Sequence, residues 1–196
     1  MVYRISNHKT SSKQSLVDCG ANGGVAGSDE HFSNRMHRHV DIQGIDNHQL
    51  TDVGIGTVGG VVDTQQGPAI AFMHQYALFG KGNTIHAPGQ LKWYQCDVND
   101  KSIHCSGLQH IKTPNVYVIP LNIVNGLPHM SMHPFTDHEW DTLPHVFLTS
   151  EMEWDPSVLN HSHDDEQWFD AVSELEAYWN TNLFDEFGNY SHRFTV

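Results

Sequence analysis

Short apolar runs separated by glycine, asparagine and aspartate limit what this chain of 196 residues can fold into more than any other feature. Residues 15–18, 39–43, 54–64 and 84–86 each read as a strand, bounded by residues that favour turns. Such turn signals at intervals of roughly 8–12 residues are typical of small barrels and sandwiches. Strands and helices do not alternate here, which disfavours a parallel α/β sheet. The first 125 residues therefore predict an all-β fold.

The rest of the chain combines prolines with one strong helical pattern. Six prolines interrupt residues 113–164, namely Pro114, Pro120, Pro128, Pro134, Pro144 and Pro156. Proline fixes φ and removes a backbone donor, so we expect this stretch to be an extended segment that wraps the β-rich part. Residues 165–179 predict an amphipathic helix from the spacing of four apolar side chains, Trp168, Val172, Leu175 and Trp179.

Three shorter helical turns are also predicted. Residues 88–94 begin with proline and would form one or two turns around Leu91 and Trp93. Thr136 and Glu139 have the spacing of a capping box, in which each side chain caps the other residue's backbone. Residues 155–156, Asp-Pro, place an N-cap before a first-turn proline.

Composition excludes several classes of function. The formal net charge is −13, from 10 basic and 23 acidic residues, and an acidic chain repels the phosphates of nucleic acids. No apolar run approaches the roughly 18 residues of a membrane span, and residues 1–14 lack the apolar core of a signal peptide. Three cysteines are too few for a disulfide framework, so a reducing, intracellular compartment is expected.

The turn Asp18-Cys19-Gly20-Ala21 is the motif that predicts chemistry. Asp-Ser/Thr-Gly-Ala directly after an apolar strand is the signature of aspartic proteases, and this turn matches it at every position except Cys19. Gly20 permits a tight turn, so that the Asp18 carboxylate projects into a cleft, and the apolar Leu16 and Val17 anchor the turn in the core.

Aspartic protease chemistry needs two such carboxylates. Held a few ångströms apart, they cannot both ionise and therefore share one proton. The ionised member takes a proton from the attacking water, and the protonated member donates to the oxygen of the peptide carbonyl. The sequence has one turn of this kind, since Asp52-Val53-Gly54 lacks both the alanine and the preceding apolar strand. The second carboxylate must then come from a second copy in a symmetric homodimer.

Several stretches of the chain resemble one known family. Residues 16–24 carry the motif, residues 59–67 and 84–91 look like downstream strands, and residues 119–145 look like a connector. Together they resemble the protease and the protease-to-integrase connector in gag-pol polyproteins of copia-type LTR retrotransposons, as found in algal elements.

The resemblance implies a fold, an activity and a division into domains. Residues 12–112 would form a retropepsin-like domain, a small acid-protease barrel, and residues 113–196 a polyprotein connector that ends in the helix. As a homodimer the protein would hydrolyse peptide bonds of its parent polyprotein, in the cytoplasm or in a virus-like particle. Its substrate would be an extended polypeptide, and its partners would include neither nucleic acid nor membrane. The chemistry requires no metal and no organic cofactor.

The family also implies roles for individual residues. Asp18 would be the catalytic acid and base, within an active-site turn formed by Cys19, Gly20 and Ala21. A flap over the substrate needs glycine hinges, and two stretches offer them. The candidate flap residues are Gly44, Ile45, Gly56 and Gly59.

Cys19 departs from the family pattern, which has Ser or Thr at this position. In the family that hydroxyl bonds across the dimer and braces the paired turns, and a thiol is the weaker donor and acceptor. Two interpretations therefore stay open, an active protease and a catalytically inactive dimerisation module of the same fold.

Two further alternatives rest on the histidines and the thiols. The best candidate metal ligands among the sixteen histidines and three cysteines are His37, His39, His161, His163 and the run from Cys96 to His110, but their spacings match no familiar zinc set. A metal-binding module stays the third interpretation, while solvated histidines are the simpler one. A cysteine protease built on Cys19 would need a basic partner or a helix N-terminus to lower the thiol pKa. A glycine-rich turn supplies neither.

Overall fold

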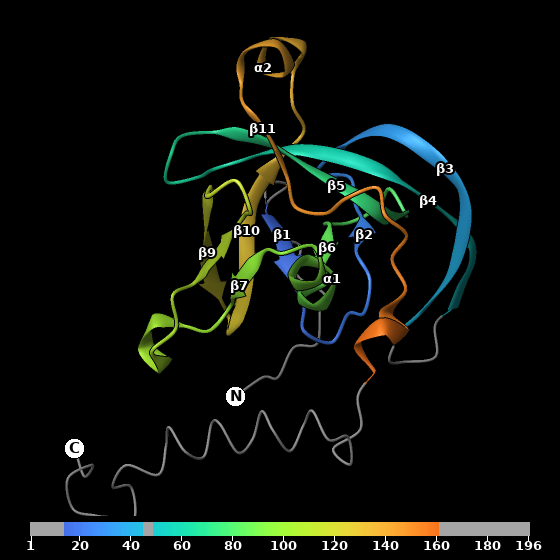
Figure 1. Cartoon of the computed structure of the whole chain (residues 1–196), viewed down its shortest axis with the longest axis horizontal. Helices are drawn as coiled ribbons and strands as arrows, with labels where there is room; N and C mark the ends of the chain where they lie inside the picture. The colour runs from blue at the N-terminus through green and yellow to red at the C-terminus, as the bar shows by residue number, and fades with distance from the viewer. Residues whose placement is uncertain (1–13, 45–48, 161–196) are drawn as a thin grey trace, which may run out of the picture. The chain divides into compact units, whose positions relative to one another are not determined.

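Figure 1 shows a computed structural model of the chain, which describes residues 14–44 and 49–160. The elements of its first half are β1 (Gln14–Val17), β2 (Val25–Ala26), β3 (His31–Gln43), β4 (Gln49–Val62), β5 (Ala69–Leu78), β6 (Ile85–His86) and α1 (Pro88–Trp93). The later elements are β7 (Asp97–Asn99), the 3-10 turn η1 (Ile103–Cys105), β8 (His110–Lys112), β9 (Val118–Val124), β10 (Leu127–His133), α2 (Asp137–Thr142), β11 (His145–Phe147) and the 3-10 turn η2 (Pro156–Leu159). The amphipathic helix predicted over residues 165–179 lies outside the described residues.

The strands of the described residues form one sheet, and the predicted all-β class is confirmed. The strand order is β3-β4-β5-β2-β6-β1-β10-β9-β8-β7, with β11 paired to β5. Neighbouring strands are antiparallel except for the pairs β1–β6, β2–β5 and β5–β11. No helix in the described part of the chain is long and apolar enough to cross a membrane.

The hydrophobic core lies on both faces of the β4–β5 hairpin. Every residue of β5 except Leu78 is buried. Met73 and Tyr76 join the main cluster, whereas Ile70 and Phe72 belong to a second, smaller one. Because both faces are covered, apolar and polar residues do not alternate along the strand, and its two polar residues, His74 and Gln75, are buried as well.

Strands β3 and β4 form a long antiparallel hairpin. Their pairing runs from His31 opposite Gly59 to Gln43 opposite Gln49, with breaks in register along the way. The first residues of β4 are exposed or partly exposed, and its last eight are buried. One end of the hairpin thus belongs to the core, and the other end, which carries the tip, extends into solvent (Figure 1).

Residues 118–133 form a hairpin that completes the sheet around β1. Strand β10 pairs with β1, where Leu16 lies opposite His129, and also with β4, where Val62 lies opposite Met132. Two of the prolines that predicted an irregular segment are accommodated in this hairpin, Pro120 opposite His110 and Pro128 opposite Ile123.

The described residues up to Pro156 belong to one compact unit, without a break at residue 112. The physical reason is backbone pairing, because β10 supplies the hydrogen-bonding partner of β1. The part of the expected connector from residue 113 to 156 therefore contributes three strands to this unit, β9, β10 and β11.

The shorter helical predictions are confirmed. Helix α1 spans Pro88–Trp93, and α2 begins after a capping box in which Thr136 and Glu139 cap each other's backbone. The turn η2 begins at Pro156, as the preceding Asp155 predicts, and has 3-10 geometry.

A chain that ends at Lys112 is expected not to fold cooperatively, whereas a chain that ends at Asn160 keeps the unfolding transition of the full chain. The shorter chain loses β9–β11, and with β10 it loses the buried Met130 and Met132, which leaves the edge of β1 without its pairing strand. Urea denaturation followed by far-UV circular dichroism measures this. A cooperative transition with an unchanged midpoint in the shorter chain would contradict the assigned pairing of β1 with β10.

Candidate active-site turn

Strand β1 delivers the Asp18 turn to the middle of the sheet. It pairs in parallel with β6, with Leu16 opposite Ile85 and Val17 opposite His86. The backbone N–H of Asp18 donates to the carbonyl of His86 at 2.9 Å, and the N–H of Ala21 donates to the carbonyl of Asp18 at 3.0 Å. Val17 is buried. The apolar strand thus anchors the turn, as the sequence predicts.

The Asp18 carboxyl is partly buried and held from one side. Its Oδ1 accepts a hydrogen bond from the backbone N–H of Gly20 at 2.8 Å. A Cβ atom at Gly20 would lie 3.2 Å from this same Oδ1, while the φ angle of Gly20 lies outside the left-handed region. Gly20 therefore contributes space beside the carboxylate, and not the positive φ of a glycine-only turn. Within the described residues, Oδ2 of Asp18 has no hydrogen-bond partner.

Cys19 turns toward its own chain. Its thiol donates to Oδ2 of Asp100, with the sulfur and oxygen 2.8 Å apart. This hydrogen bond, partial burial and the negative charge of Asp100 together raise the pKa of the Cys19 thiol to about 11. The thiol is therefore protonated at neutral pH, which opposes a cysteine-protease role because the thiolate is the nucleophile.

Three buried polar side chains behind the turn, Ser15, Tyr76 and His86, form a series of hydrogen bonds. Nε2 of His86 is 2.8 Å from Oγ of Ser15, and Nδ1 is 3.0 Å from the hydroxyl of Tyr76. Burial lowers the pKa of His86 to about 3, so the imidazole is neutral and offers one donor and one acceptor. Because Ser15 donates to the carbonyl of Met130 at 3.4 Å, it accepts from Nε2–H, and Nδ1 accepts from Tyr76. Each of these three side chains therefore has a hydrogen-bonding partner.

The glycine-rich stretch after the turn packs on the same groups. A Cβ atom at Gly24 would lie 2.3 Å from Cζ of Tyr76, so only glycine fits against this ring. The N–H of Gly24 donates to Oε1 of the fully buried Gln90 at 2.7 Å, and Nε2 of Gln90 donates to the carbonyl of Gln75 at 3.2 Å. Gln90 therefore connects the turn region to α1 and β5.

Asp29 holds the start of β6, and a second carboxyl group, that of Glu30, follows it in the chain. Oδ1 of Asp29 accepts from the N–H and the hydroxyl of Thr84, at 2.8 and 2.6 Å. Both carboxyl oxygens of Glu30 are shielded from solvent. Burial, followed by the charge of Asp29, raises the pKa of Glu30 to about 8. Burial also raises the pKa of Asp29.

A segment after β11, residues 148–154 (the strap), ties the turn to the β3–β4 hairpin. The indole N–H of Trp154 donates to the carbonyl of Asn22 at 2.8 Å, just beyond the Asp18 turn. Arg38 of β3 donates to the carbonyl of Trp154 at 3.0 Å and forms an ion pair with Glu153 at 3.3 Å. Thr149 exchanges two hydrogen bonds with the backbone of His74. Three elements that are distant in sequence are thereby fixed to one another.

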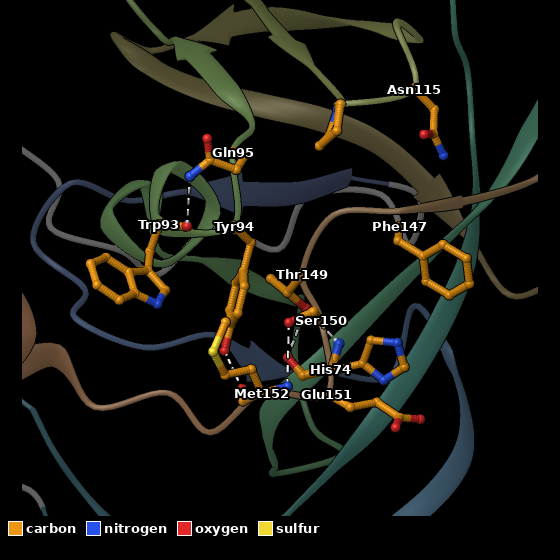
Figure 2. A pocket seen from close by; sticks show the side chains of 11 residues that line it. His74, Trp93, Tyr94, Gln95, Asn115, Phe147, Thr149, Ser150, Glu151 and Met152 are labelled. Carbon is orange, nitrogen blue, oxygen red and sulfur yellow. Dashed lines mark hydrogen bonds between the residues drawn. The ribbon is translucent and has the colours of Figure 1, made fainter.

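Two pockets in the described part of the chain are lined by residues other than Asp18. Figure 2 shows an open pocket of about 850 Å³ between the end of α1 and the strap. Its lining includes Trp93, Tyr94, Phe147 and Met152. A smaller pocket of about 240 Å³ contains His74 and Phe147 as well. Asp18 lines neither of these two pockets.

The two candidate flap stretches differ in how their backbones are paired. Gly44 directly follows β3 at the tip of the hairpin, and its neighbour Ile45 lies outside the described residues. Gly56 and Gly59 lie inside β4 and pair on both sides, with β3 and with β5. A hinge needs freedom that such paired residues lack, so the tip of the hairpin is the better placed candidate.

The predicted metal ligands do not gather within residues 14–44 and 49–160, where no group of three or more His, Cys, Asp or Glu side chains could hold an ion. Cys96 is buried and donates to the carbonyl of Leu148 at 3.3 Å, and burial raises its pKa to about 12. Cys105 is exposed on η1. His161 and His163 lie outside the described residues.

Comparison of the chain with protein-family models, curated proteins and solved structures gives no match. Function is therefore inferred from the geometry of the turn and of the strands behind it.

Gly24→Ala should destabilise the protein by about 1–3 kcal/mol or more, because the added methyl group would overlap the rigid, buried ring of Tyr76. Gly23→Ala is the matched control, since its Cβ atom would lie 3.7 Å from Nε1 of Trp154, an ordinary contact. The free energy of unfolding of the control should change by less than about 1 kcal/mol. Equal destabilisation of the two variants in urea would contradict this packing.

The free energy of unfolding of wild type should fall as pH rises because of Glu30, and Glu30→Gln should remove this dependence on pH. The folded protein keeps Glu30 protonated between its ordinary pKa of 4.5 and about 8, whereas the unfolded chain releases this proton. The contribution of protonated Glu30 to the free energy of unfolding is therefore fully present below pH 4.5 and is lost as pH rises through 8. The slope of this loss is up to about 1.4 kcal/mol per pH unit.

Urea titrations of wild type and Glu30→Gln between pH 4.5 and 8.5 test this prediction. The variant should gain stability relative to wild type as pH rises. A constant difference between the two proteins across this range would show that Glu30 titrates alike in both states.

Proposed function

We propose that this chain is one subunit of a retropepsin-type aspartic endopeptidase that cleaves its parent polyprotein as a homodimer. Asp18 supplies one carboxylate of the catalytic pair, and Asp18 of a second copy supplies the other. The pair shares one proton, activates a water molecule and protonates the oxygen of the peptide carbonyl.

The observation that carries the proposal is the position of the Asp18 carboxyl. The strand β1, in which Ser15 and Val17 are buried, ends directly before this residue. A parallel strand fixes the backbone N–H of Asp18, and the N–H of Gly20 holds one carboxyl oxygen. The second oxygen has no hydrogen-bond partner within the described residues. An aspartate at an ordinary strand end does not require this buried support.

Two features favour a site that two chains complete. Asp18 lines neither of the two pockets described above, and a second chain against the turn would add walls around its carboxyl group. The β3–β4 hairpin extends beyond the core and offers an arm that can cover a bound substrate. An extended peptide would then lie between the paired turns and the hairpins, in the manner of an added strand.

A catalytically inactive module of the same fold is the second candidate, and one observation favours it. The thiol of Cys19 bonds to Asp100 of its own chain, so it does not brace a partner's turn in this arrangement. A dimer without this brace would hold its two carboxylates less firmly. The two candidates differ in one property, which is peptide hydrolysis.

Asp18→Asn should lower kcat for peptide cleavage by at least about 10²–10⁴-fold, because an amide cannot act as the general base. Asp63→Asn, which alters an exposed carboxylate just beyond β4, is the matched control and should cleave as wild type does. Mass spectrometry of a peptide mixture incubated between pH 4 and 7 measures the products.

Wild-type cleavage should be fastest on the acidic side, where the pair holds one proton, and a pepstatin-type inhibitor should abolish it. The catalytic proposal would be falsified if wild type and Asp18→Asn cleaved equally, or if neither cleaved at any pH while both remained dimeric. The last result would favour the inactive module.

A further inference from the structure

Asp100 contacts the Asp18 turn from a part of the chain that no sequence motif connects with it. It directly follows β7, and its Oδ2 accepts the thiol hydrogen of Cys19 across 81 residues of chain. Cys19 is the residue next to Asp18, so a restraint on its side chain also restrains the backbone that carries the catalytic carboxylate. The contact is between two side chains and depends on the identity of both.

The loop that carries Asp100 is built to hold it in place. Oδ1 of Asn99 accepts from the N–H of Leu108 at 2.9 Å, and the N–H of Gly107 donates to the carbonyl of Ser102 at 2.8 Å. The backbone of Gly107 packs directly on Lys101, since a Cβ atom at Gly107 would lie 1.8 Å from the Lys101 carbonyl oxygen. A loop closed by its own hydrogen bonds can fix a carboxylate with little loss of entropy on forming the contact.

The charges around the thiol favour a protonated donor. Asp100 and Asp18 both oppose formation of the thiolate, and Lys92 of α1 acts in the opposite direction. The bond to Asp100 is the largest cause of the rise in the thiol pKa to about 11. A thiol that keeps its hydrogen serves as a donor to a carboxylate and not as a nucleophile.

We propose that Asp100 is a positioning residue for the Asp18 turn, acts through Cys19, and holds this turn within a single chain. Its consequence for catalysis rests on the function proposed above. While the contact lasts, the thiol hydrogen points into its own chain and does not bond to a second one. Asp100 thus supplies within one chain the restraint that residue 19 would otherwise supply between two chains.

The contact itself is tested by alkylation with iodoacetamide, which reacts with thiolates. Cys105 is exposed and serves as the internal reference in the same sample. At pH 8–9 Cys19 of the intact protein should react more slowly than Cys105, and Asp100→Ala should accelerate Cys19 by about 10–100-fold, the change expected for one to two pKa units. Mass spectrometry of the two cysteine peptides gives both rates.

Two further variants separate the charge of Asp100 from its geometry. Asp100→Asn removes the charge but keeps an acceptor, so it should accelerate Cys19 less than Asp100→Ala does. Asp97→Asn alters an exposed carboxylate on β7, the strand before Asp100, 3.7 Å from His110, and should leave the rate of Cys19 unchanged. Thermal unfolding of each variant shows whether it has kept its fold. A Cys19 rate that Asp100→Ala does not change in a folded protein overturns the proposal.

The positioning role is tested by kinetics on a cleaved peptide. Asp100→Ala should lower kcat by about 10-fold or more with KM within about twofold, since it displaces the carboxylate and not the substrate. Cys19→Ser should keep this dependence on Asp100, because a hydroxyl can donate to the same oxygen. Unchanged kcat together with faster alkylation would mean that the contact exists but does not position Asp18, and the proposal would be wrong.

The two proposals fail in different ways. If no variant, wild type included, cleaves any peptide, the proposed protease function fails. The alkylation rates then still decide whether Asp100 holds the turn, because they require no catalysis.

Discussion

The parallel pairing of β1 with β6 is the constraint on which the rest of the structure depends. It places the end of β1 at the carbonyl of His86, where the backbone of Asp18 is held. Behind the pair, Ser15, His86 and Tyr76 pass hydrogen bonds in one direction to the carbonyl of Met130. An unpaired polar group at such depth costs about 1–3 kcal/mol, so the removal of any one of these side chains would leave its hydrogen-bonding partner buried and unpaired. These buried hydrogen bonds fix β1 and β6, and thereby the position of the Asp18 turn.

The network also explains why the chain needs its later residues. Met130 belongs to β10, and the strap after β11 brings Trp154 to the carbonyl of Asn22. The turn near the N-terminus is thus completed by residues more than a hundred positions away. Arg38, bonded to the same strap, links the middle of β3 to these residues. If the β3–β4 hairpin covers a substrate, the hairpin and the Asp18 turn would both be held by the strap.

Local signals predicted local structure. The apolar residues before Asp18, the proline of α1 and the capping box at Thr136 act within a few residues, and each of these elements is present. The burial of His86 and Gln90 could not be predicted, because the partners that satisfy them come from other strands. Proline density misled the interpretation of residues 113–156, since prolines are tolerated at particular positions of a hairpin. The contact of Asp100 with Cys19 has no signal in the sequence, since it depends on where two distant turns meet.

The central claim is that Asp18 is half of a catalytic pair. The most direct measurement is a crystal structure of the assembled protein with a pepstatin-type inhibitor. Two Asp18 carboxylates should then face each other across a two-fold axis, each within about 3 Å of the inhibitor hydroxyl that stands in for the attacking water. An assembly in which the two Asp18 carboxylates lie more than about 10 Å apart, with the inhibitor bound elsewhere or not at all, would contradict the claim, since a shared proton requires near contact.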